Sequence, residues 1–553
     1  MKLSKILKNV EYRVINKDTL NAENKEPLNA DDINIIGLTL DSRRVKPGYV
    51  FFAVKGFETD GHKYIQKAIA NGAVAVVLSD ANSLTSPSFD ADISKEKTAF
   101  ILVDDMRKSM SEIADNFYDK PGDKIVVYGV TGTNGKTTTT NVIRDILENG
   151  MASPINCGYI GTNGIKYGEV EIAPEMTTPD VITLKKYLYD MVNAGMRAVS
   201  MEVTSHGLAL GRVDGISFDV AAFTNLTHDH LDFHKTMEEY FAAKQLLFKG
   251  LSPKAISILN ADDESTIEKL KEVSGGEVFT YGMKDSDYMI RDLVLKADGS
   301  SFTLEISSRA MDAHRSRTDS LVMNSDGAFG KSIYQIETNL LAEYNVYNLV
   351  AAIACLHQRG FKIEDFTGWL DNITQVDGRM ESVPNDLGIN VIVDYAHTVD
   401  AMEKVYDFVE SVCESQEDLN RKRPKIISVF GSAGKRDKTK RPYMGITAYN
   451  HSDYIILTED DPRDEDPAQI AYEIKGELDD GNISIIIDRV VAIRTALEMA
   501  KKGDFVLVLG KGEDRFMARE FERAPWDGDN IIAKRILDEL SSTRKSDNLN
   551  YGY

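Results

Sequence analysis

The residues with the clearest chemical signature form a glycine-rich loop, Gly129-Val-Thr-Gly-Thr-Asn-Gly-Lys-Thr137. It follows an apolar, strand-like run and precedes a stretch with apolar residues at helical spacing. Gly132 and Gly135 let backbone amides approach phosphate oxygens, while Lys136 can reach the β and γ phosphates and Thr137 can ligate Mg²⁺. A valine replaces the first glycine of the strict motif, so a ligand-free capping turn is the alternative. The order of strand, loop and helix favours ATP or GTP binding.

A carboxylate and a cluster of histidines follow the loop. The segment AVSMEVTSHGL predicts a buried strand with Glu202 near its end, on the face opposite Val199 and Met201. A buried carboxylate is costly unless it is paired or bound to a metal. The later segment NLTHDHLDFH places three histidines, with His230 in the middle, within seven residues. A hydrogen-bonded loop residue is the simpler interpretation of any one histidine, but beside a nucleotide loop we favour Mg²⁺ ligation by one of them.

Lys244 lies on the apolar face of a predicted helix over 237–249. It falls three residues after Phe241 in a stripe of aromatic and aliphatic residues. One interpretation is a lysine stem that covers apolar surface while its ammonium reaches water. The other is chemical modification, because a carbamate formed with CO₂ presents carboxylate oxygens to a cation, whereas an ammonium cannot. Periodicity does not decide between them.

The elements that must position these residues are those of an α/β fold. Short runs rich in Val and Ile alternate with amphipathic stretches, which is typical of parallel sheets covered by helices. The composition predicts domains over residues 1–118, 119–373 and 374–553. In the last domain four apolar runs end in polar or glycine-rich residues, where open parallel sheets bind ligands. The polar stretch Ser307–Ser332 predicts a loop or hairpin.

Composition limits the kinds of partner. Lys plus Arg number 65 against 87 Asp plus Glu, and the formal net charge of −22 argues against nucleic-acid and anionic-membrane binding. The 3 cysteines are too few and too scattered for a disulfide framework and fit a reducing compartment. No apolar signal core follows the N-terminal lysines, and the apolar runs are strand-length. We therefore expect a cytoplasmic protein without membrane insertion.

The ordered set of motifs resembles the Mur ligase family, ATP-dependent enzymes that form amide bonds in the peptidoglycan stem peptide. The N-terminal segment 40–62 is similar to the uridine-nucleotide-binding domain of the member that adds the third residue. The resemblance implies three domains, with a central P-loop ATPase-like parallel sheet and a C-terminal Rossmann-like domain. The other similar segments, in chain order, are 129–139, 201–208, 223–234, 240–247, 344–352, 378–381 and 394–397.

The resemblance also implies a mechanism. ATP would phosphorylate the D-glutamate carboxylate of UDP-N-acetylmuramoyl-L-alanyl-D-glutamate, and the amine of a diamino acid would then attack the acyl phosphate. Two Mg²⁺ ions would be needed between the like charges. By similarity, Thr137 and Glu202 serve one ion, while His230 and Lys244, the latter as N6-carboxylysine, serve the other.

Other binding positions are implied by matching motifs alone. Asn345 would contact the adenine, Arg379 the γ-phosphate and Asp394 the nucleotide side of the interdomain cleft. The implied catalytic set is Lys136, Glu202, His230, Lys244 and Arg379. The implied ATP-binding set is Gly132, Thr133, Asn134, Gly135, Lys136, Thr137, Thr138, Asn345, Arg379 and Asp394. The implied substrate-binding set is Ser42, Arg43, Thr177, Thr178, Thr204, Arg212, Arg436, Asp461, Arg463, Gly510 and Asp514.

The amino acid to be added is read from the stretch Asp460–Arg463. Members that use meso-diaminopimelate typically have Asp-Asn-Pro-Arg, so Asp461 adds a negative charge, and Glu513 with Asp514 makes the pocket more acidic. Such a pocket favours a cationic side-chain terminus, although Arg463 could pair with a carboxylate. We expect L-lysine, with meso-diaminopimelate or L-ornithine as the alternatives. A folylpolyglutamate-synthetase-like ligase is a more distant alternative, and a monomer is expected.

Overall fold

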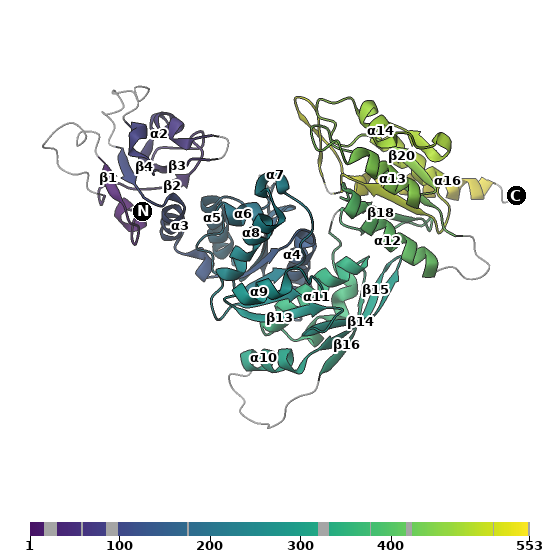
Figure 1. Ribbon diagram of the computed structural model, residues 1–553, viewed down its shortest axis with the longest axis horizontal. Helices are drawn as coiled ribbons and strands as arrows, with labels where there is room; N and C mark the ends of the chain where they lie inside the picture. Colours follow the sequence, from purple (N-terminus) through teal and green to yellow (C-terminus); the bar gives the residue numbers. More distant parts are fainter. Residues whose placement is uncertain are drawn as a thin grey trace. The chain divides into compact units, whose positions relative to one another are not determined.

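The computed structural model describes residues 1–15, 30–56, 59–84, 98–173, 176–318, 331–376, 378–415, 423–512 and 514–550 (Figure 1). Glu513 therefore lies outside the described residues. Residues 1–280 and residues 281–553 form two compact units. The predicted α/β class is confirmed, because parallel sheets packed against helices recur along the chain.

The first sheet of the leading unit has the strand order β1-β5-β4-β3-β2. Strands β2 to β5 run parallel, and β1 pairs antiparallel with β5. Because neighbouring strand residues face opposite sides, Phe52 packs into a core with α1 and α3, while Phe51 packs into another with α2. The elements are α1 Leu3–Ile6, β1 Arg13–Ile15, β2 Gly37–Thr39, β3 Tyr49–Ala53, α2 Ile65–Ala70, β4 Ala73–Leu78, β5 Ala99–Leu102 and α3 Met106–Tyr118.

In the second sheet, which has 11 strands, those that lie wholly in this unit have the order β12-β11-β6-β10-β7-β8-β9. The neighbouring strands β12, β11, β6, β10 and β7 are parallel, and β8 and β9 extend the sheet beyond β7 in antiparallel pairs. The strands are β6 Val126–Thr131, β7 Cys157–Gly161, β8 Gly164–Tyr167, β9 Val170–Ile172, β10 Ala198–Glu202, β11 Val220–Phe223 and β12 Ile256–Asn260. The helices are α4 Lys136–Asp145, α5 Val181–Asn193, α6 Ser205–Ala209, α7 Leu231–His234, α8 Met237–Lys249 and α9 Ile267–Val273.

Side-chain caps fix where the helices of this sheet begin. The Asp180 carboxylate accepts hydrogen bonds from the amides of Ile182 and Thr183, which starts α5. The hydroxyl of Thr236 accepts from the amide of Glu239 and starts α8. The start of α4 differs, because Gly135 precedes it with φ +85° and provides no side chain. That helix therefore begins without a side-chain cap, which suits phosphate binding at its first turn.

The second unit begins with an antiparallel meander of β14, β15 and β16, and β14 also pairs parallel with the end of β13. The loop or hairpin predicted for Ser307–Ser332 is wrong in its first part, where a helix spans Ser308–Thr318. Ala310, Met311 and His314 are buried and anchor that helix although its sequence is mostly polar. The elements are β13 Glu277–Gly282, β14 Tyr288–Lys296, β15 Gly299–Ile306, α10 Ser308–Thr318, β16 Ser332–Thr338 and α11 Glu343–Gln358.

The last sheet has the order β17-β18-β22-β19-β20-β21. Five neighbouring strands, β18, β22, β19, β20 and β21, are parallel, and β17 pairs antiparallel with β18. The four predicted runs are its strands β18, β19, β20 and β22. Helices α12 to α14 pack on one face, and α15 and α16 pack on the other. The strands are β17 Glu381–Ser382, β18 Asn390–Asp394, β19 Ile426–Phe430, β20 Tyr454–Leu457, β21 Ile483–Ile485, β22 Phe505–Leu509, β23 Phe516–Ala518 and β24 Arg523–Pro525. The helices are α12 Val399–Ser415, α13 Arg441–His451, α14 Pro467–Lys475, α15 Arg489–Met499 and α16 Asp529–Asn550.

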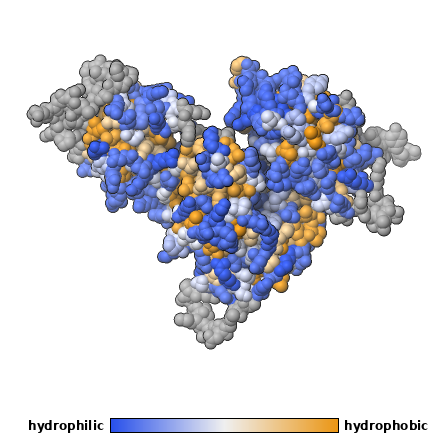
Figure 2. All heavy atoms as spheres, in the orientation of Figure 1, coloured by the Kyte–Doolittle hydropathy of each residue, from blue (hydrophilic) through white to orange (hydrophobic). Residues whose placement is uncertain are grey.

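The surface differs from these cores in polarity. Hydrophilic residues cover most of the face drawn in Figure 2, as the high content of charged residues predicts. Among the helices that the structure describes, none is both long enough and apolar enough to cross a membrane.

Candidate active site

The glycine-rich loop joins β6 to α4, in the arrangement the sequence predicts. Gly132 has φ +151°, and a Cβ atom there would lie 1.9 Å from the Thr224 hydroxyl, so no larger residue fits. The amide of Asn134 donates to the Asn225 side chain at 3.0 Å, and this bond ties the loop to the segment after β11. The loop thus has the shape and the open helix start that suit a nucleotide phosphate.

Lys136 and Lys244 meet at this loop. Lys136 Nζ donates to the carbonyl oxygens of Gly132 and Thr133, at 3.1 and 2.8 Å. Lys244 Nζ donates to the Gly132 carbonyl at 2.6 Å, and the residue is only 1% exposed. The interpretation in which the Lys244 ammonium reaches water is therefore wrong. Burial lowers the pKa of Lys244 well below its ordinary value, and the charge of Lys136 lowers it further.

Tyr240 links several predicted site residues. Its hydroxyl lies 3.1 Å from the Thr133 hydroxyl, and Lys244 Nζ lies 4.4 Å from the centre of its ring. The ring of His230 is 6.0 Å away and edge-on. His230 itself has φ +54°, precedes α7 and keeps 43% of its side chain exposed. The structure thus gathers His230, Lys244 and the loop around one tyrosine, which the sequence presents only as part of an apolar stripe.

Glu202 ends β10 and is completely buried, as predicted. Its Oε1 accepts hydrogen bonds from the Tyr159 hydroxyl at 2.8 Å and from the Thr162 amide at 2.9 Å. A Cβ on Gly161 would lie 2.4 Å from the same oxygen, so the glycine leaves room for the carboxylate. These donors stabilise a buried carboxylate. They come from β7 and the turn after it, and the Glu202 motif does not predict them.

The predicted substrate residues of the leading unit fall into two groups. Thr178 connects the first group. Its hydroxyl donates to the Glu202 carbonyl and lies 3.1 Å from the Thr204 hydroxyl. Its carbonyl accepts a hydrogen bond from Arg212 at 3.0 Å. Thr177 joins through Thr162, whose hydroxyl lies 3.2 Å from its own. This group therefore surrounds the carboxyl end of β10.

The second group, Ser42 and Arg43, lies in the turn after β2. Ser42 is buried, and its carbonyl accepts a hydrogen bond from Asn71 at 2.8 Å. Arg43 extends into solvent and binds the Asp41 carboxylate through two nitrogens, which holds the pKa of that carboxyl below its usual value. An exposed guanidinium on a braced turn suits contact with an anionic ligand.

The predicted nucleotide residues of the second unit are held by their own neighbours. Asn345 is buried and donates to the Leu341 carbonyl at 2.9 Å. Asp394 accepts from the amides of Met380 and Ala396, both at 2.7 Å, and burial raises its pKa although Arg379 opposes the shift. The Arg379 guanidinium stacks on the Tyr395 ring at 4.7 Å. Their contacts with a nucleotide stay a prediction.

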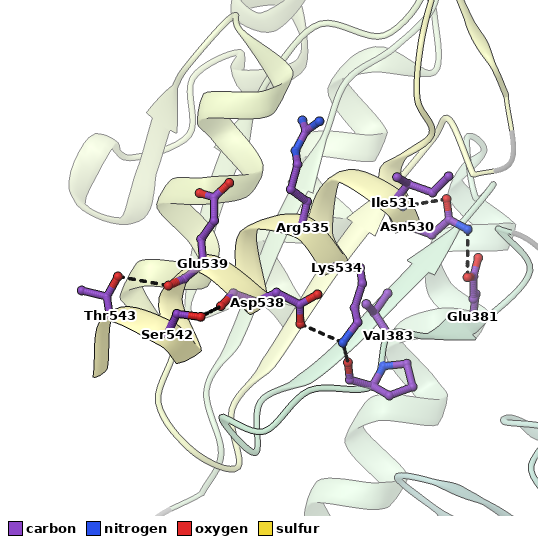
Figure 3. Close-up of a pocket in the computed structure, with 11 residues that line it drawn as sticks. Glu381, Val383, Asn530, Ile531, Lys534, Arg535, Asp538, Glu539, Ser542 and Thr543 are labelled. Atoms are coloured by element: carbon purple, nitrogen blue, oxygen red, sulfur yellow. Dashed lines mark hydrogen bonds and ion pairs between the residues drawn. The ribbon is translucent and has the colours of Figure 1, made fainter. Parts of the chain in front are cut away.

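Most of the predicted amino-acid-binding residues line a cavity of about 680 Å³. Arg436, Asp461, Arg463 and Asp514 all line it, together with the β23–β24 hairpin. Gly510 lies behind it, where φ is +107° and a Cβ would lie 2.5 Å from an Asp460 oxygen. A different cavity, of about 1120 Å³, runs along α16 and β17, where Lys534 bonds to Asp538 and to the Pro384 carbonyl (Figure 3).

The negative charge on Asp461, from which L-lysine is expected, has a buried cation beside it. Asp461 does not face the cavity as an uncompensated charge, because the fully buried Lys511 lies 2.7 Å from its Oδ1 and 3.2 Å from Asp514 Oδ2. Arg463 does not pair with Asp461 but donates to the Gly434 carbonyl at 2.8 Å. The contact between Lys511 and Asp461 is not predicted from the sequence, because the two residues are 50 positions apart in the chain.

The predicted metal ligands differ in how well they suit Mg²⁺. Within the described ranges, no three His, Cys, Asp or Glu side chains come together as a metal-binding group. Mg²⁺ in nucleotide sites commonly takes one or two protein oxygens and completes its shell with phosphates and water. Thr137 is buried in the first turn of α4, and Glu202 ends the strand beside β6. These residues fit such an ion, whereas Lys244 could ligate only after modification.

Comparison with known proteins decides the family. Family models match residues 34–118 (Mur ligase family, catalytic domain), 130–356 (Mur ligase middle domain) and 378–512 (Mur ligase, glutamate ligase domain). A UDP-N-acetylmuramoyl-L-alanyl-D-glutamate--2,6-diaminopimelate ligase from Clostridioides difficile is 38% identical over 514 residues, which cover 92% of this chain and 96% of that protein. The chain belongs to the Mur ligase family.

Other Mur ligases extend the similarity to the whole chain. A ligase of the same name from Clostridium tetani is 35% identical and covers 98% of this chain and 100% of that protein. A solved structure with that name has a TM-score of 0.64 at 27% identity and covers 96% of this chain and 100% of the other. The MurF ligase of Thermotoga maritima shares the fold, with a TM-score of 0.58 at 20% identity, and covers 93% of this chain and 99% of the other. Mur ligases are ATP-dependent and generally require Mg²⁺, and this chain is an ATP-dependent ligase.

Proposed function

We propose that this ligase adds meso-2,6-diaminopimelate to the D-glutamate carboxylate of UDP-N-acetylmuramoyl-L-alanyl-D-glutamate. The observation that carries the choice of amino acid is the Lys511–Asp461 pair, because it removes the reason to expect a cationic side chain in the cavity. Two arginines, Arg436 and Arg463, line the same cavity and suit the carboxylate at the far end of diaminopimelate. The names of the similar ligases from Clostridioides difficile and Clostridium tetani support the same choice.

The proposed reaction divides among three domains with the predicted boundaries. Residues 1–118 bind the uridine nucleotide, residues 119–373 bind ATP, and residues 374–553 bind the amino acid. A carboxylate oxygen of the substrate attacks the γ-phosphate of ATP, ADP leaves, and the amine then displaces phosphate from the acyl phosphate to form the amide. Mg²⁺, when bound, neutralises the negative charges that meet at the γ-phosphate.

The chain's own residues hold the reactants for this step. The α4 amides and Lys136 would bind the phosphates, while Thr137 and Glu202 would hold Mg²⁺. Arg379 stabilises negative charge at the γ-phosphate. Thr178 holds the predicted substrate-binding residues together around the carboxyl end of β10.

We further propose that Lys244 is carbamylated and, with His230, serves a second Mg²⁺. Its lowered pKa favours the neutral amine, whose nitrogen attacks the carbon of CO₂, forms an N–C bond and loses one proton. The product carries a negative charge where the unmodified side chain carries none or a positive one. That exchange also removes the repulsion between Lys244 and Lys136.

The test is phosphate release from ATP with UDP-N-acetylmuramoyl-L-alanyl-D-glutamate and Mg²⁺. Meso-diaminopimelate, L-lysine and L-ornithine are added in separate reactions, and each product is weighed by mass spectrometry. We expect release that depends on the nucleotide dipeptide and is fastest with meso-diaminopimelate. Faster turnover with L-lysine would reverse the choice of amino acid, and no release with any of them would refute the function. A parallel assay of folate polyglutamylation is expected to give no product.

A further inference from the structure

Lys511 is a buried cation directly behind the wall of the amino-acid cavity. It follows β22 and is 0% exposed. Its Nζ lies 2.7 Å from Asp461 Oδ1, 3.2 Å from Asp514 Oδ2 and 4.0 Å from Asp460 Oδ1. Asp461 and Asp514 line the cavity, so Lys511 contacts two side chains that also border the cavity.

The surroundings keep Lys511 charged. Burial alone lowers the pKa of a lysine, but the carboxylates of Asp460, Asp514 and Asp461 outweigh burial, and the pKa of Lys511 is above its ordinary value. Burial raises the pKa of Asp460 to about 6 although Arg489 and Lys511 oppose the shift. Three carboxyl groups thus surround the Lys511 side chain, and two of them, those of Asp461 and Asp514, line the cavity.

Lys511 also fixes where Asp461 points. Asp461 has φ +42°, and its Oδ1 accepts from the Ala518 amide at 2.9 Å as well as from Lys511. The amide of Arg463 donates to the Ala518 carbonyl at 3.0 Å, so the loop and β23 are joined on both sides of this carboxylate. One Asp461 oxygen is thus held by two donors, and the loop that carries Arg463 is held in register with the hairpin.

We propose that Lys511 is a positioning residue that sets which amino acid the ligase prefers. By compensating Asp461 and Asp514 from behind, it keeps the cavity from attracting a second ammonium and lets Arg436 and Arg463 select a terminal carboxylate. The inference rests on the proposed function. It adds that amino-acid preference follows the charge of the Asp461–Asp514–Lys511 group rather than the identity of Asp461 alone.

The test is a series of full-length variants in which that charge changes stepwise. For each enzyme, kcat/KM is measured with meso-diaminopimelate and with L-lysine, and their ratio is the readout. Lys511→Met makes the group more negative, and we expect the ratio to fall by about tenfold or more towards L-lysine. Asp461→Asn makes it less negative and is expected to hold or raise the ratio. The double variant Lys511→Met/Asp461→Asn restores the wild-type charge and is expected to return the ratio to within about threefold of wild type.

Two controls keep the outcomes distinct. Lys534→Met removes an exposed lysine that pairs with Asp538 on α16 at 2.9 Å, and it should leave the ratio unchanged. Asp514→Asn carries the same charge change as Asp461→Asn and provides a second route if Lys511→Met does not fold. A ratio that falls in either Asp variant, or that stays constant in Lys511→Met while total activity drops, would overturn the inference. Failure of the wild type to use diaminopimelate would refute the proposed function, whether or not the ratio responds to charge.

Discussion

Lys136 and Lys244 donate to the same acceptor, the carbonyl oxygen of Gly132, at 3.1 and 2.6 Å. Two ammonium groups this close repel each other, and Lys244 has almost no solvent to screen the repulsion. The arrangement is relieved if one lysine is neutral or becomes anionic, or if phosphate draws Lys136 away from the carbonyl. It therefore favours a neutral Lys244, which is the form that the proposed carbamylation requires.

Replacing Lys244 with alanine is expected to lower kcat by about 100-fold or more, because the variant loses an anionic group that would serve a metal ion. Phosphate release is the measurement, and adding a short carboxylic acid should restore part of the activity. Lys249→Ala is the matched control, since Lys249 lies on the same helix but is exposed. Near-normal turnover in Lys244→Ala without the acid would remove the carbamate from the mechanism.

Glu202→Gln separates charge from shape. Glutamine retains an oxygen that can accept from the Thr162 amide, so the fold should persist, but it removes the negative charge proposed to hold Mg²⁺. We expect phosphate release to fall by about 100-fold or more while the far-ultraviolet circular dichroism stays unchanged. Tyr159→Phe removes one donor to the same carboxylate and should have a smaller effect. Equal losses in the two variants would instead point to packing.

A buried histidine pair predicts acid sensitivity of the second unit. His357 stacks on His314 with ring centres 3.9 Å apart, and Tyr288 OH lies 2.7 Å from its Nδ1. Burial, with a contribution from His314, lowers the pKa of His357 from 6.5 to about 3. Between about pH 6.5 and 3 the unfolded chain therefore binds more protons at His357 than the folded chain does, and as the pH drops this residue alone should lower stability by at most about 1.4 kcal/mol per pH unit.

Thermal unfolding of wild type and His357→Gln between pH 7 and pH 5 measures this dependence. We expect the variant to be less stable at pH 7 but to lose less stability on acidification. Parallel curves for the two proteins would show that another group controls the acid sensitivity.

Lys185 and Asp115 form an ion pair between α5 and α3, at 2.6 Å, with exposures of 0% and 14%. Burial raises the pKa of Asp115 and lowers that of Lys185, so desolvation outweighs the attraction at both partners. Lys185→Met should lower the free energy of unfolding by about 3 kcal/mol, because it leaves a buried carboxylate without its partner. Chemical denaturation of Lys185→Met and of Lys185→Met/Asp115→Leu tests this, and the double variant is expected to recover most of the loss.

The sequence predicted those parts of the site whose chemistry is contiguous in the chain. The strand, glycine loop and Lys136 follow one another, and Glu202 alternates with apolar neighbours on a single strand, so order and period locate them. Lys511 could not be found this way, since its partners Asp460 and Asp461 come from another strand end. Its own motif contains two glycines and acidic residues that mark a turn but do not reveal a buried cation.

Helix α10 was missed for a different reason. Its few apolar residues give a weak helical period, and the helix is held by the buried side chains of Ala310, Met311 and His314. His314 donates a hydrogen bond through Nδ1 to the carbonyl oxygen of His357, 2.6 Å away on α11. Tertiary contacts of this kind override local propensity and leave no local trace in the sequence.

The bonds that join the Asp460–Arg463 loop to β23 also bear on how the substrate of such an enzyme can change through evolution or design. Asp461 is fixed by Lys511 and by the Ala518 amide, which lie 50 and 57 residues away in the chain. Transplanting the loop alone would separate the carboxylate from the groups that neutralise and orient it. If this group sets the amino-acid preference as proposed, a change of preference requires linked substitutions in distant segments, because a single exchange within the loop would leave a buried charge without its partner.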